Sequence, residues 1–379
     1  MSRIIARTES LINMNYCKQI TYTYYHSSRS DFESMLDDVL SQLPVDSIIL
    51  RLVCWCAPAD NNEYEQWLSL YRRRVREYFM DRVPGYELVA QPPLCGGMVL
   101  EVHAYRPTQD DVVYYKKFEK HPYVLIENPA GRFLFASGFH GSGLLANARL
   151  QAEATFQQLS ALIKSEGFVP SNIIRQWNYI ERITACDGED QRYQSFNNVR
   201  ADYYATDVWT NGYPAATGIG ASFGGVCVDV DVAQSTNDSC IITPIDNHLQ
   251  VAAHAYSSDV IRASGNKKNS PKFERAKSVE VNGVKLIYIS GTAAIRGEES
   301  LEGVGLQKQL EVTLENIEQL TQDLSLRHIR VYLKNPDDYD EASRLLSERI
   351  PSVSREFFTA DVCRNALLIE IEGIAKCSL

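Results

Sequence analysis

Hydrophobic and polar positions in the last third of the chain follow a clear order of elements. Residues 285–291 alternate as a β-strand does, and apolar residues at helical spacing follow in residues 306–320. That stripe consists of Leu306, Leu310, Leu314, Ile317 and Leu320. The pattern then predicts a strand in 328–335, a helix in 339–350, a strand in 354–362 and a closing strand in 366–376. The order is β-α-β-α-β-β.

The same order of elements occurs twice more upstream. The second copy has strands at 132–138, 172–183, 213–221 and 225–233, with helices at 150–168 and 193–204. A weaker copy near the N-terminus has strands at 17–26, 47–58, 86–93 and 97–105, with helices at 30–43 and 62–79. An internal repeat of this kind decides the architecture of the whole chain.

The repeat predicts an α/β (α+β) fold of three β-α-β-α-β-β units that form an intramolecular pseudo-trimer around a central barrel. We place the first, degenerate unit at residues 1–125 and the second at 126–240. Residues 241–379 hold a connecting segment and the third unit, which we expect to be catalytic. The connection, roughly 234–284, is long enough to suggest a part in a binding site.

Carboxylates occupy the same place in the closing strand of each copy. They are Glu101, Asp229 and Glu370, and each follows an apolar residue, namely Leu100, Val228 and Ile369. Successive side chains of a strand point to opposite faces, so helices covering the apolar face leave the acids facing the shared interior or a seam.

Composition and charge narrow the range of partners. The chain has 379 residues, is 45% hydrophobic and carries a formal net charge of -10, without a block of Lys and Arg that would follow a phosphate backbone. We therefore expect no nucleic-acid partner. No window is apolar enough for a membrane span, and the N-terminus does not read as a secretion signal, so we expect a cytosolic protein with no membrane partner.

The nine cysteines do not suggest disulfides, because their number is odd, their spacing is irregular and no C-x-x-C pair occurs. Cys54 and Cys56 share one face of a predicted strand, which favours a place in the core over a metal site. His140 and His254 have no partner at a metal-ligand spacing, so the sequence predicts no metal.

Two features of the second and third copies suggest chemistry. The glycine-rich residues 217–225 are followed by a strand instead of a helix, so they do not form a dinucleotide site. Glu370 and Glu372 share one strand face, and a partly desolvated carboxylic acid there would have a raised pKa and could donate a proton at neutral pH. Arginines suited to binding carboxylates occur at positions 200, 275, 355 and 364.

Several segments together resemble one known family, the chorismatases, also called pteridine-dependent dioxygenase-like proteins. The segments are RQWNYIERI (175–183), YQSFNNVR (193–200), PAATGIGA (214–221), PKFERA (271–276), LIYISGTA (286–293) and DVCRNALLIEIEG (361–373). The resemblance extends over about residues 98 to 379, and the second and third copies are also similar to the trimeric YjgF/RidA superfamily.

The resemblance implies an enzyme that removes pyruvate from the enolpyruvyl ether of chorismate, with no metal and no organic cofactor. Its acid would be the first glutamate of the closing E-I-E-G, here Glu370, which protonates the enolpyruvyl methylene. By the same resemblance Tyr193, Arg200, Tyr256 and Arg275 contact the substrate, the two arginines through its carboxylates.

Two positions distinguish branches of the family. Hydrolases tend to carry alanine where this chain has Gly291 and Cys363, so the Gly and Cys pair resembles the 3-hydroxybenzoate synthase branch. A glycine leaves room for the ring, and a cysteine is polarisable and could help to move a proton during aromatisation. The alternatives are hydrolysis to a dihydrodiol acid or a mixture of 3- and 4-hydroxybenzoate.

A different class of function stays open at this point, namely an imine deaminase of the RidA type or a ligand-binding protein. Arg355 precedes Glu370 at a spacing like that of the carboxylate-binding arginine in those deaminases. Three copies in one chain would satisfy the seams of a trimer, so we expect a monomer.

Overall fold

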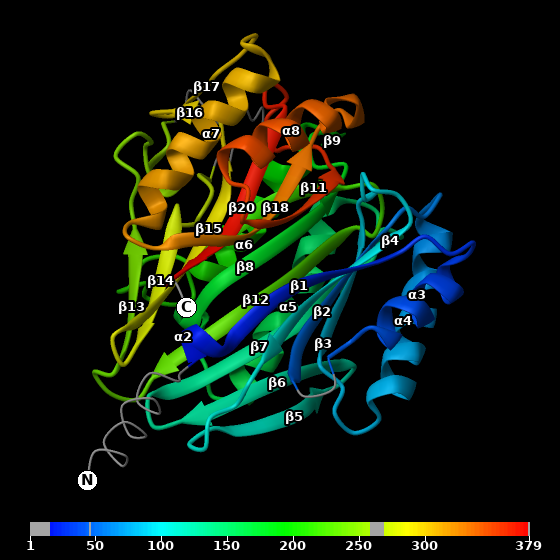
Figure 1. Ribbon diagram of the computed structural model, residues 1–379, viewed down its shortest axis with the longest axis vertical. Helices are drawn as coiled ribbons and strands as arrows, with labels where there is room; N and C mark the ends of the chain where they lie inside the picture. The colour runs from blue at the N-terminus through cyan, green and yellow to red at the C-terminus, as the bar shows by residue number, and fades with distance from the viewer. Residues whose placement is uncertain (1–15, 45–46, 258–268, 378–379) are drawn as a thin grey trace.

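The computed structural model describes residues 16–44, 47–257 and 269–377 (Figure 1). Three β-sheets, one for each predicted unit, stand side by side, and two helices cover the outer side of each. None of the helices in these ranges combines the length and the apolar character needed to cross a bilayer. The mixed α+β class predicted from the repeat is confirmed.

The first unit begins at the first turn of described chain, α2 (Tyr16–Gln19). Its elements are β1 (Ile20–Ser27), α3 (Phe32–Ser41), β2 (Ile48–Cys56), α4 (Asn61–Phe79), β3 (Gly85–Ala90) and β4 (Met98–Tyr105). Asp31 and Asp60 cap α3 and α4, each accepting a hydrogen bond from a backbone N–H of the first turn.

The second and third units repeat this order, with a short 3-10 turn near the middle of each. In the second unit the elements are β7 (Gly131–Gly141), α5 (Ala148–Ser165), η1 (Pro170–Asn172), β8 (Ile173–Glu181), α6 (Arg192–Tyr204), β11 (Ala215–Ala221) and β12 (Val226–Ser235). In the third they are β15 (Val284–Ala293), α7 (Gly305–Thr321), β18 (Ser325–Leu333), η3 (Pro336–Asp338), α8 (Tyr339–Arg349), β19 (Ser354–Thr359) and β20 (Ile369–Lys376).

The order of the strands shows that the three units share one topology. The neighbours run β1-β4-β2-β3 in the first sheet, β7-β12-β8-β11 in the second and β15-β20-β18-β19 in the third. In each case the closing strand lies between the first and second strands and is antiparallel to both, while the second and third strands are parallel. The predicted repeat is therefore confirmed in three dimensions.

Two further pairs of strands extend this plan. Strands β5 (Val112–Phe118) and β6 (His121–Asn128) add to the second sheet, and β13 (Cys240–Ile245) and β14 (Ala276–Val281) add to the third. The boundary expected between residues 125 and 126 falls within β6, so by sheet membership the second unit begins before β5. The connection expected at roughly 234–284 agrees with the stretch between β12 and β15, and it contains the paired strands β13 and β14. Residues 258–268 of it lie outside the described part, as do residues 1–15 of the first unit.

Shorter elements lead into the helices of the second and third units. The two-residue strands β9 (Cys186–Asp187) and β10 (Asp190–Gln191) pair ahead of α6, and β16 (Ile295–Arg296) and β17 (Glu299–Ser300) pair ahead of α7. A 3-10 turn, η2 (Ala253–Ala255), precedes the gap in the description.

The apolar neighbours of the three carboxylates pack under the helices, as predicted. Leu100, Val228 and Ile369 belong to three separate clusters that lie between each sheet and its own helices. Cys54 and Cys56 lie in the first of these clusters, so their expected place in the core is confirmed. The opposite faces of the three sheets meet around a common interior.

Candidate active site

A cavity of about 840 Å³ lies at the seam between the second and third units. One side comes from α6 and β11 of the second unit, and the other from β15, β20 and the segment before β20 of the third. Its lining includes all seven residues to which the resemblance gives a role in catalysis, substrate contact or product choice, namely Tyr193, Arg200, Tyr256, Arg275, Gly291, Cys363 and Glu370. Residues 170 positions apart therefore share one concave site, the usual form of a small-molecule site.

Register shows that Glu370 is the third-unit counterpart of Glu101 and Asp229. Glu370 pairs with Tyr332 of β18, Asp229 with Trp177 of β8, and Glu101 with Val53 of β2, which are equivalent positions in the three sheets. Of these three acids, only Glu370 lines the cavity. Glu101 is held by Arg330 and His103, and Asp229 accepts a hydrogen bond from the Gly138 N–H.

Glu370 is a buried acid, with 5% of its surface exposed. Desolvation raises the pKa of its carboxyl to about 8, although Arg175 and Arg275 act in the opposite direction. No residue in the described ranges is seen to hydrogen-bond to this carboxyl. Glu370 is therefore largely protonated at neutral pH and free to donate its proton into the cavity.

Because Gly291 has no side chain, it leaves the space that the Glu370 carboxyl occupies. It lies at a bulge in the pairing of β15 with β20, two residues before Ala293, which pairs with Glu370. A β-carbon at position 291 would overlap Oε1 of Glu370 and lie 3.0 Å from its Cδ. The Gly291 N–H also donates to Oγ1 of Thr217 at 3.1 Å, which fixes the bulge against β11.

Two buried arginines in the cavity wall have no carboxylate partner among the described residues. Arg200 is 1% exposed, and its Nη2 donates to the Asn197 amide oxygen at 2.6 Å. Arg275 is 3% exposed, and its Nη2 donates to the Val251 carbonyl and the Tyr256 hydroxyl. The Nε of each is buried without a hydrogen bond. Buried arginines that have no carboxylate partner and an unbonded Nε favour the binding of an anionic ligand.

Cys363 and Tyr193 complete the part of the wall nearest Glu370. Burial and the nearby Glu370 carboxylate raise the pKa of the Cys363 thiol to about 12, so the thiol stays protonated and is no thiolate nucleophile. The Tyr193 ring lies against Gly218, where a β-carbon would come within 3.0 Å of it. Burial raises the pKa of the Tyr193 phenol as well, so it remains a hydrogen-bond donor.

Sequence reasoning left one arginine of the cavity without a role. The Arg364 guanidinium lies 5.0 Å from the centre of the Tyr256 ring and donates to the Glu298 carbonyl and the Ser300 hydroxyl. Arg364 lines the cavity, whereas Arg355 does not. Arg355 donates instead to the backbone carbonyls of Ile350 and Pro351, so the arginine expected for a deaminase is not in this site.

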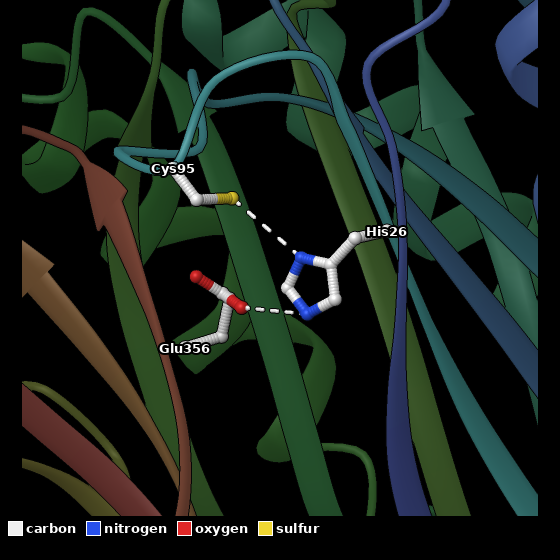
Figure 2. A group of neighbouring side chains, drawn as sticks. All are labelled: His26, Cys95 and Glu356. Carbon is white, nitrogen blue, oxygen red and sulfur yellow. Dashed lines mark hydrogen bonds and ion pairs between the residues drawn. The ribbon is translucent and has the colours of Figure 1, made fainter.

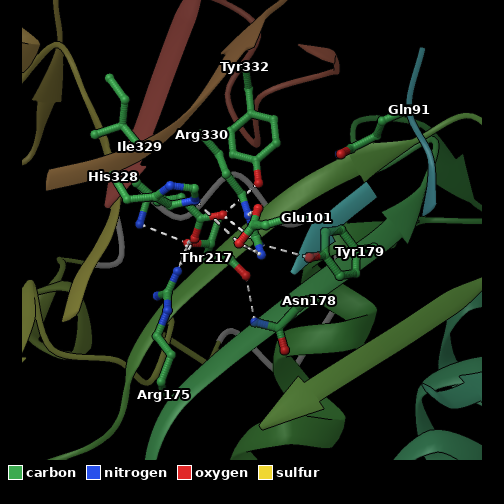
Figure 3. Close-up of polar contacts among 12 residues, drawn as sticks. Gln91, Glu101, Arg175, Asn178, Tyr179, Thr217, His328, Ile329, Arg330 and Tyr332 are labelled. Carbon is green, nitrogen blue, oxygen red and sulfur yellow. Dashed lines mark hydrogen bonds and ion pairs between the residues drawn. The ribbon is translucent and has the colours of Figure 1, made fainter. Parts of the chain in front are cut away.

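Glu372 belongs to the interior of the molecule instead of the cavity. Its carboxylate accepts hydrogen bonds from four side chains on three different strands, namely Arg175, Arg330, Thr217 and Tyr332 (Figure 3). Thr217 also accepts from Arg175. Glu372 is thus fixed by charge and hydrogen bonds and makes a poor substitute for Glu370 as an acid.

A ring of buried ion pairs links the three units around this interior, and sequence reasoning missed it. Arg51, Arg175 and Arg330 occupy equivalent positions of β2, β8 and β18, opposite His103, Asp231 and Glu372. Arg51 of the first unit pairs with Asp231 of the second, Arg175 of the second with Glu372 of the third, and Arg330 of the third with Glu101 of the first. Each unit is therefore tied to the next in a closed cycle.

Comparison with known proteins finds similarity to the chorismatases. Residues 124–230 match the family model described as chorismatase FkbO/Hyg5-like, N-terminal. Over 266 residues the chain is 29% identical to a 3-hydroxybenzoate synthase of Streptomyces hygroscopicus, a stretch that covers 64% of this chain and 74% of the relative. A chorismatase of Streptomyces rapamycinicus is 29% identical over 243 residues, which cover 58% of this chain and 68% of that one.

A solved structure agrees with these sequence relatives. A crystal structure of a chorismatase at 22% identity superimposes with a TM-score of 0.68 and covers 94% of this chain and 98% of that one. The fold is therefore that of the solved protein along nearly the whole chain. The resemblance found in the sequence motifs is confirmed.

Proposed function

We propose that this relative of the chorismatases cleaves the enolpyruvyl ether of chorismate to pyruvate and 3-hydroxybenzoate, with Glu370 as the acid. The observation that carries the proposal is a buried carboxyl with a pKa raised to about 8, facing a cavity that also contains two arginines without carboxylate partners. Relatives named chorismatase and 3-hydroxybenzoate synthase support it.

The charges of the cavity suit the substrate. Chorismate carries two carboxylates, one on its ring and one on its enolpyruvyl arm, and the guanidinium fork binds a carboxylate through two parallel hydrogen bonds. Arg200 and Arg275 approach from different units, so we assign one carboxylate to each. Tyr193 and Tyr256 offer their ring faces and hydroxyl groups to the cyclohexadiene ring of the substrate.

Protonation starts the reaction. Glu370 gives its proton to the enolpyruvyl methylene, and positive charge develops on the ether carbon, where the adjacent oxygen shares it. The ring hydroxyl then attacks that carbon within the same molecule. The bond between the ring and this oxygen breaks, and the proton on the ring carbon that carries the ether oxygen passes to the Glu370 carboxylate, which makes the ring aromatic. The bond between the ether oxygen and the former enolpyruvyl carbon then breaks: the ether oxygen takes up the hydroxyl proton and stays on the ring as the 3-hydroxyl, and the transferred oxygen becomes the keto oxygen of pyruvate.

The balance of atoms separates the two branches of the reaction. Pyruvate and 3-hydroxybenzoate together contain the atoms of chorismate, so this route consumes no water. The hydrolytic route adds one water to the ether carbon and leaves a dihydrodiol acid. We assign the first route on Gly291, which lets the Glu370 carboxyl lie beside β15, and on Cys363, a protonated thiol in the cavity wall that would relay the ring proton.

The test is to incubate the purified, metal-free protein with chorismate and to separate pyruvate and the aromatic acids by chromatography. Pyruvate with 3-hydroxybenzoate in equal amounts supports the proposal. A non-aromatic diol acid in place of 3-hydroxybenzoate would establish the hydrolase, and a mixture with 4-hydroxybenzoate the mixed branch. Unconsumed chorismate would return the RidA-like deaminase and the binding protein to consideration.

We further propose that the chain acts as a monomer in a reducing compartment such as the cytosol. The cyclic ion pairs already close the three seams that a trimer would form, and all nine cysteines are free thiols.

A further inference from the structure

Three side chains with metal-binding atoms converge at the seam between the third and first units, away from the cavity. They are His26 of β1, Cys95 in the turn before β4, and Glu356 of β19 (Figure 2). Nδ1 of His26 lies 3.6 Å from the Cys95 sulfur, and Nε2 of the same ring lies 3.3 Å from the Glu356 carboxylate. With one ligand atom taken from each residue, all three lie within 4.8 Å of one another.

The backbone holds two of these residues opposite each other. Pro93 and Phe358 form an antiparallel bridge, and the Leu94 N–H donates to the Phe357 carbonyl at 2.9 Å. Continuing that pairing by one residue places Cys95 across from Glu356. Opposed residues of an antiparallel pair have β-carbons about 5 Å apart, so both ligands are positioned before any ion arrives.

Glu356, the acid of this group, has little positive charge near its carboxylate. The Glu356 side chain is 8% exposed, accepts from the Phe357 N–H, and forms an ion pair only with His26 among the described Lys, Arg and His residues. A divalent ion bound beside this carboxylate would supply the positive charge that the buried acid lacks.

We propose that His26, Cys95 and Glu356 form a site for a divalent transition metal of the zinc type. Imidazole, thiolate and carboxylate are the three ligand types that zinc takes in proteins, at about 2.0–2.3 Å from the ion. The His26 side chain is 50% exposed, so its ring is free to turn one nitrogen to the ion. Because His26 and Cys95 are both exposed, water completes the coordination.

Such an ion would join the first unit to the third. The seam it spans is the counterpart of the one that forms the cavity, and none of the three ligands lines the cavity. Its expected effect is therefore on the stability of the fold, not on the acid chemistry of Glu370. Binding to the folded state alone raises the unfolding temperature with ion concentration.

The test uses the full chain, stripped of metal with a chelator and titrated with Co²⁺ and then Zn²⁺. One equivalent of Co²⁺ should give a thiolate-to-cobalt absorption that Zn²⁺ abolishes, and Zn²⁺ should raise the unfolding temperature. Cys95→Ser and His26→Asn should weaken binding at least about tenfold, since loss of even an outer partner of a ligand costs that much. Glu356→Gln should weaken it without removing the thiolate band.

Matched controls separate this site from the other exposed thiols and imidazoles of the chain. Cys377 and His248 are exposed residues outside the group, and Cys377→Ser and His248→Asn should bind as the parent protein does. The proposal is overturned if the parent shows no thiolate band, if Cys95→Ser keeps it, or if Cys377→Ser loses it. Where His26→Asn fails to fold, the Cys95→Ser result decides.

Discussion

Gly291 and Glu370 lie against each other across neighbouring strands, and the space that a side chain at 291 would need is occupied by the Glu370 carboxyl. The acid therefore depends on a residue without a side chain. Because Glu370 is the flexible partner in this contact, a larger residue at 291 would displace its carboxyl instead of the strand. The position of the acid is thereby linked to one of the two residues on which we base the proposed product.

Replacing Gly291 and Cys363 together by alanine should shift the product from 3-hydroxybenzoate toward the dihydrodiol acid. The new methyl group displaces the Glu370 carboxyl, and loss of the thiol removes the proposed proton relay. Chromatography of the products against time measures the ratio, with Cys363→Ala alone as the control for the thiol. Unchanged output of 3-hydroxybenzoate by the double variant would contradict the proposal that Gly291 and Cys363 determine the product.

Glu370→Gln should fold normally and lose turnover by a factor of about 10² to 10⁴, the usual contribution of a general acid. The substitution keeps the shape of the side chain and removes only the transferable proton. Steady-state pyruvate release gives the rate, and circular dichroism checks the fold. Full activity in this variant would mean that the acid lies elsewhere.

Glu372→Gln is the matched comparison, because it alters the neighbouring glutamate on the same strand face. Glu372 balances Arg175 and Arg330 in the interior, and loss of one partner of a buried pair costs about 3–5 kcal/mol. We expect this variant to unfold at lower denaturant concentration with a smaller loss of turnover than Glu370→Gln. A Glu372→Gln protein of parental stability would contradict the role of the ring.

The raised pKa of Glu370 predicts the direction of two pH profiles. Turnover needs the protonated acid, so it should be level at low pH and fall as pH rises through about 8. Stability has the same sign: the folded carboxyl keeps its proton up to about 8 while the unfolded one loses it near 4.5, so the free energy of unfolding decreases between these values. Glu370→Gln should lack this part of the slope in chemical denaturation at a series of pH values.

Most of the fold could be predicted from the sequence because period-two and helical patterns are local signals. They located the strands and helices that the three repeats share and placed the three carboxylates at one register, although Cys17 to Gln19, expected to open a strand, belong to the short helix α2. The strand pairs β5–β6 and β13–β14 were not found, because they lie where the repeat has no counterpart in the first unit, and β5 and β13 carry mixed exposure.

The ring of buried ion pairs that links the three units could not be predicted from the sequence, for a different reason. Its partners are 180, 197 and 229 residues apart, so no local pattern joins them. One signal was present: an apolar residue followed by arginine recurs at the second strand of each repeat, at Arg51, Arg175 and Arg330. Aligning the repeats at that strand as well as at the last would have found it.

Arg200→Ala and Arg275→Ala should each lower kcat/KM for chorismate, by about 30-fold or more, because each would leave a substrate carboxylate without its charged partner. Arg355→Ala is the control, since that side chain contacts only backbone carbonyls outside the cavity. Initial rates over a range of chorismate concentrations separate KM from kcat. A loss with Arg355→Ala as large as that with Arg200→Ala would revive the deaminase-type assignment.

A monomer is expected in solution, because the seams between the three repeats are already closed by ion pairs within the chain. Arg51, Arg175 and Arg330 each reach the acid of the next unit and return the cycle to the first, so no arginine of the ring is left for a second molecule. Light scattering coupled to size-exclusion chromatography should give a mass near 42.8 kDa at all loading concentrations. A mass three times larger would mean that an outer surface, and not these seams, carries association.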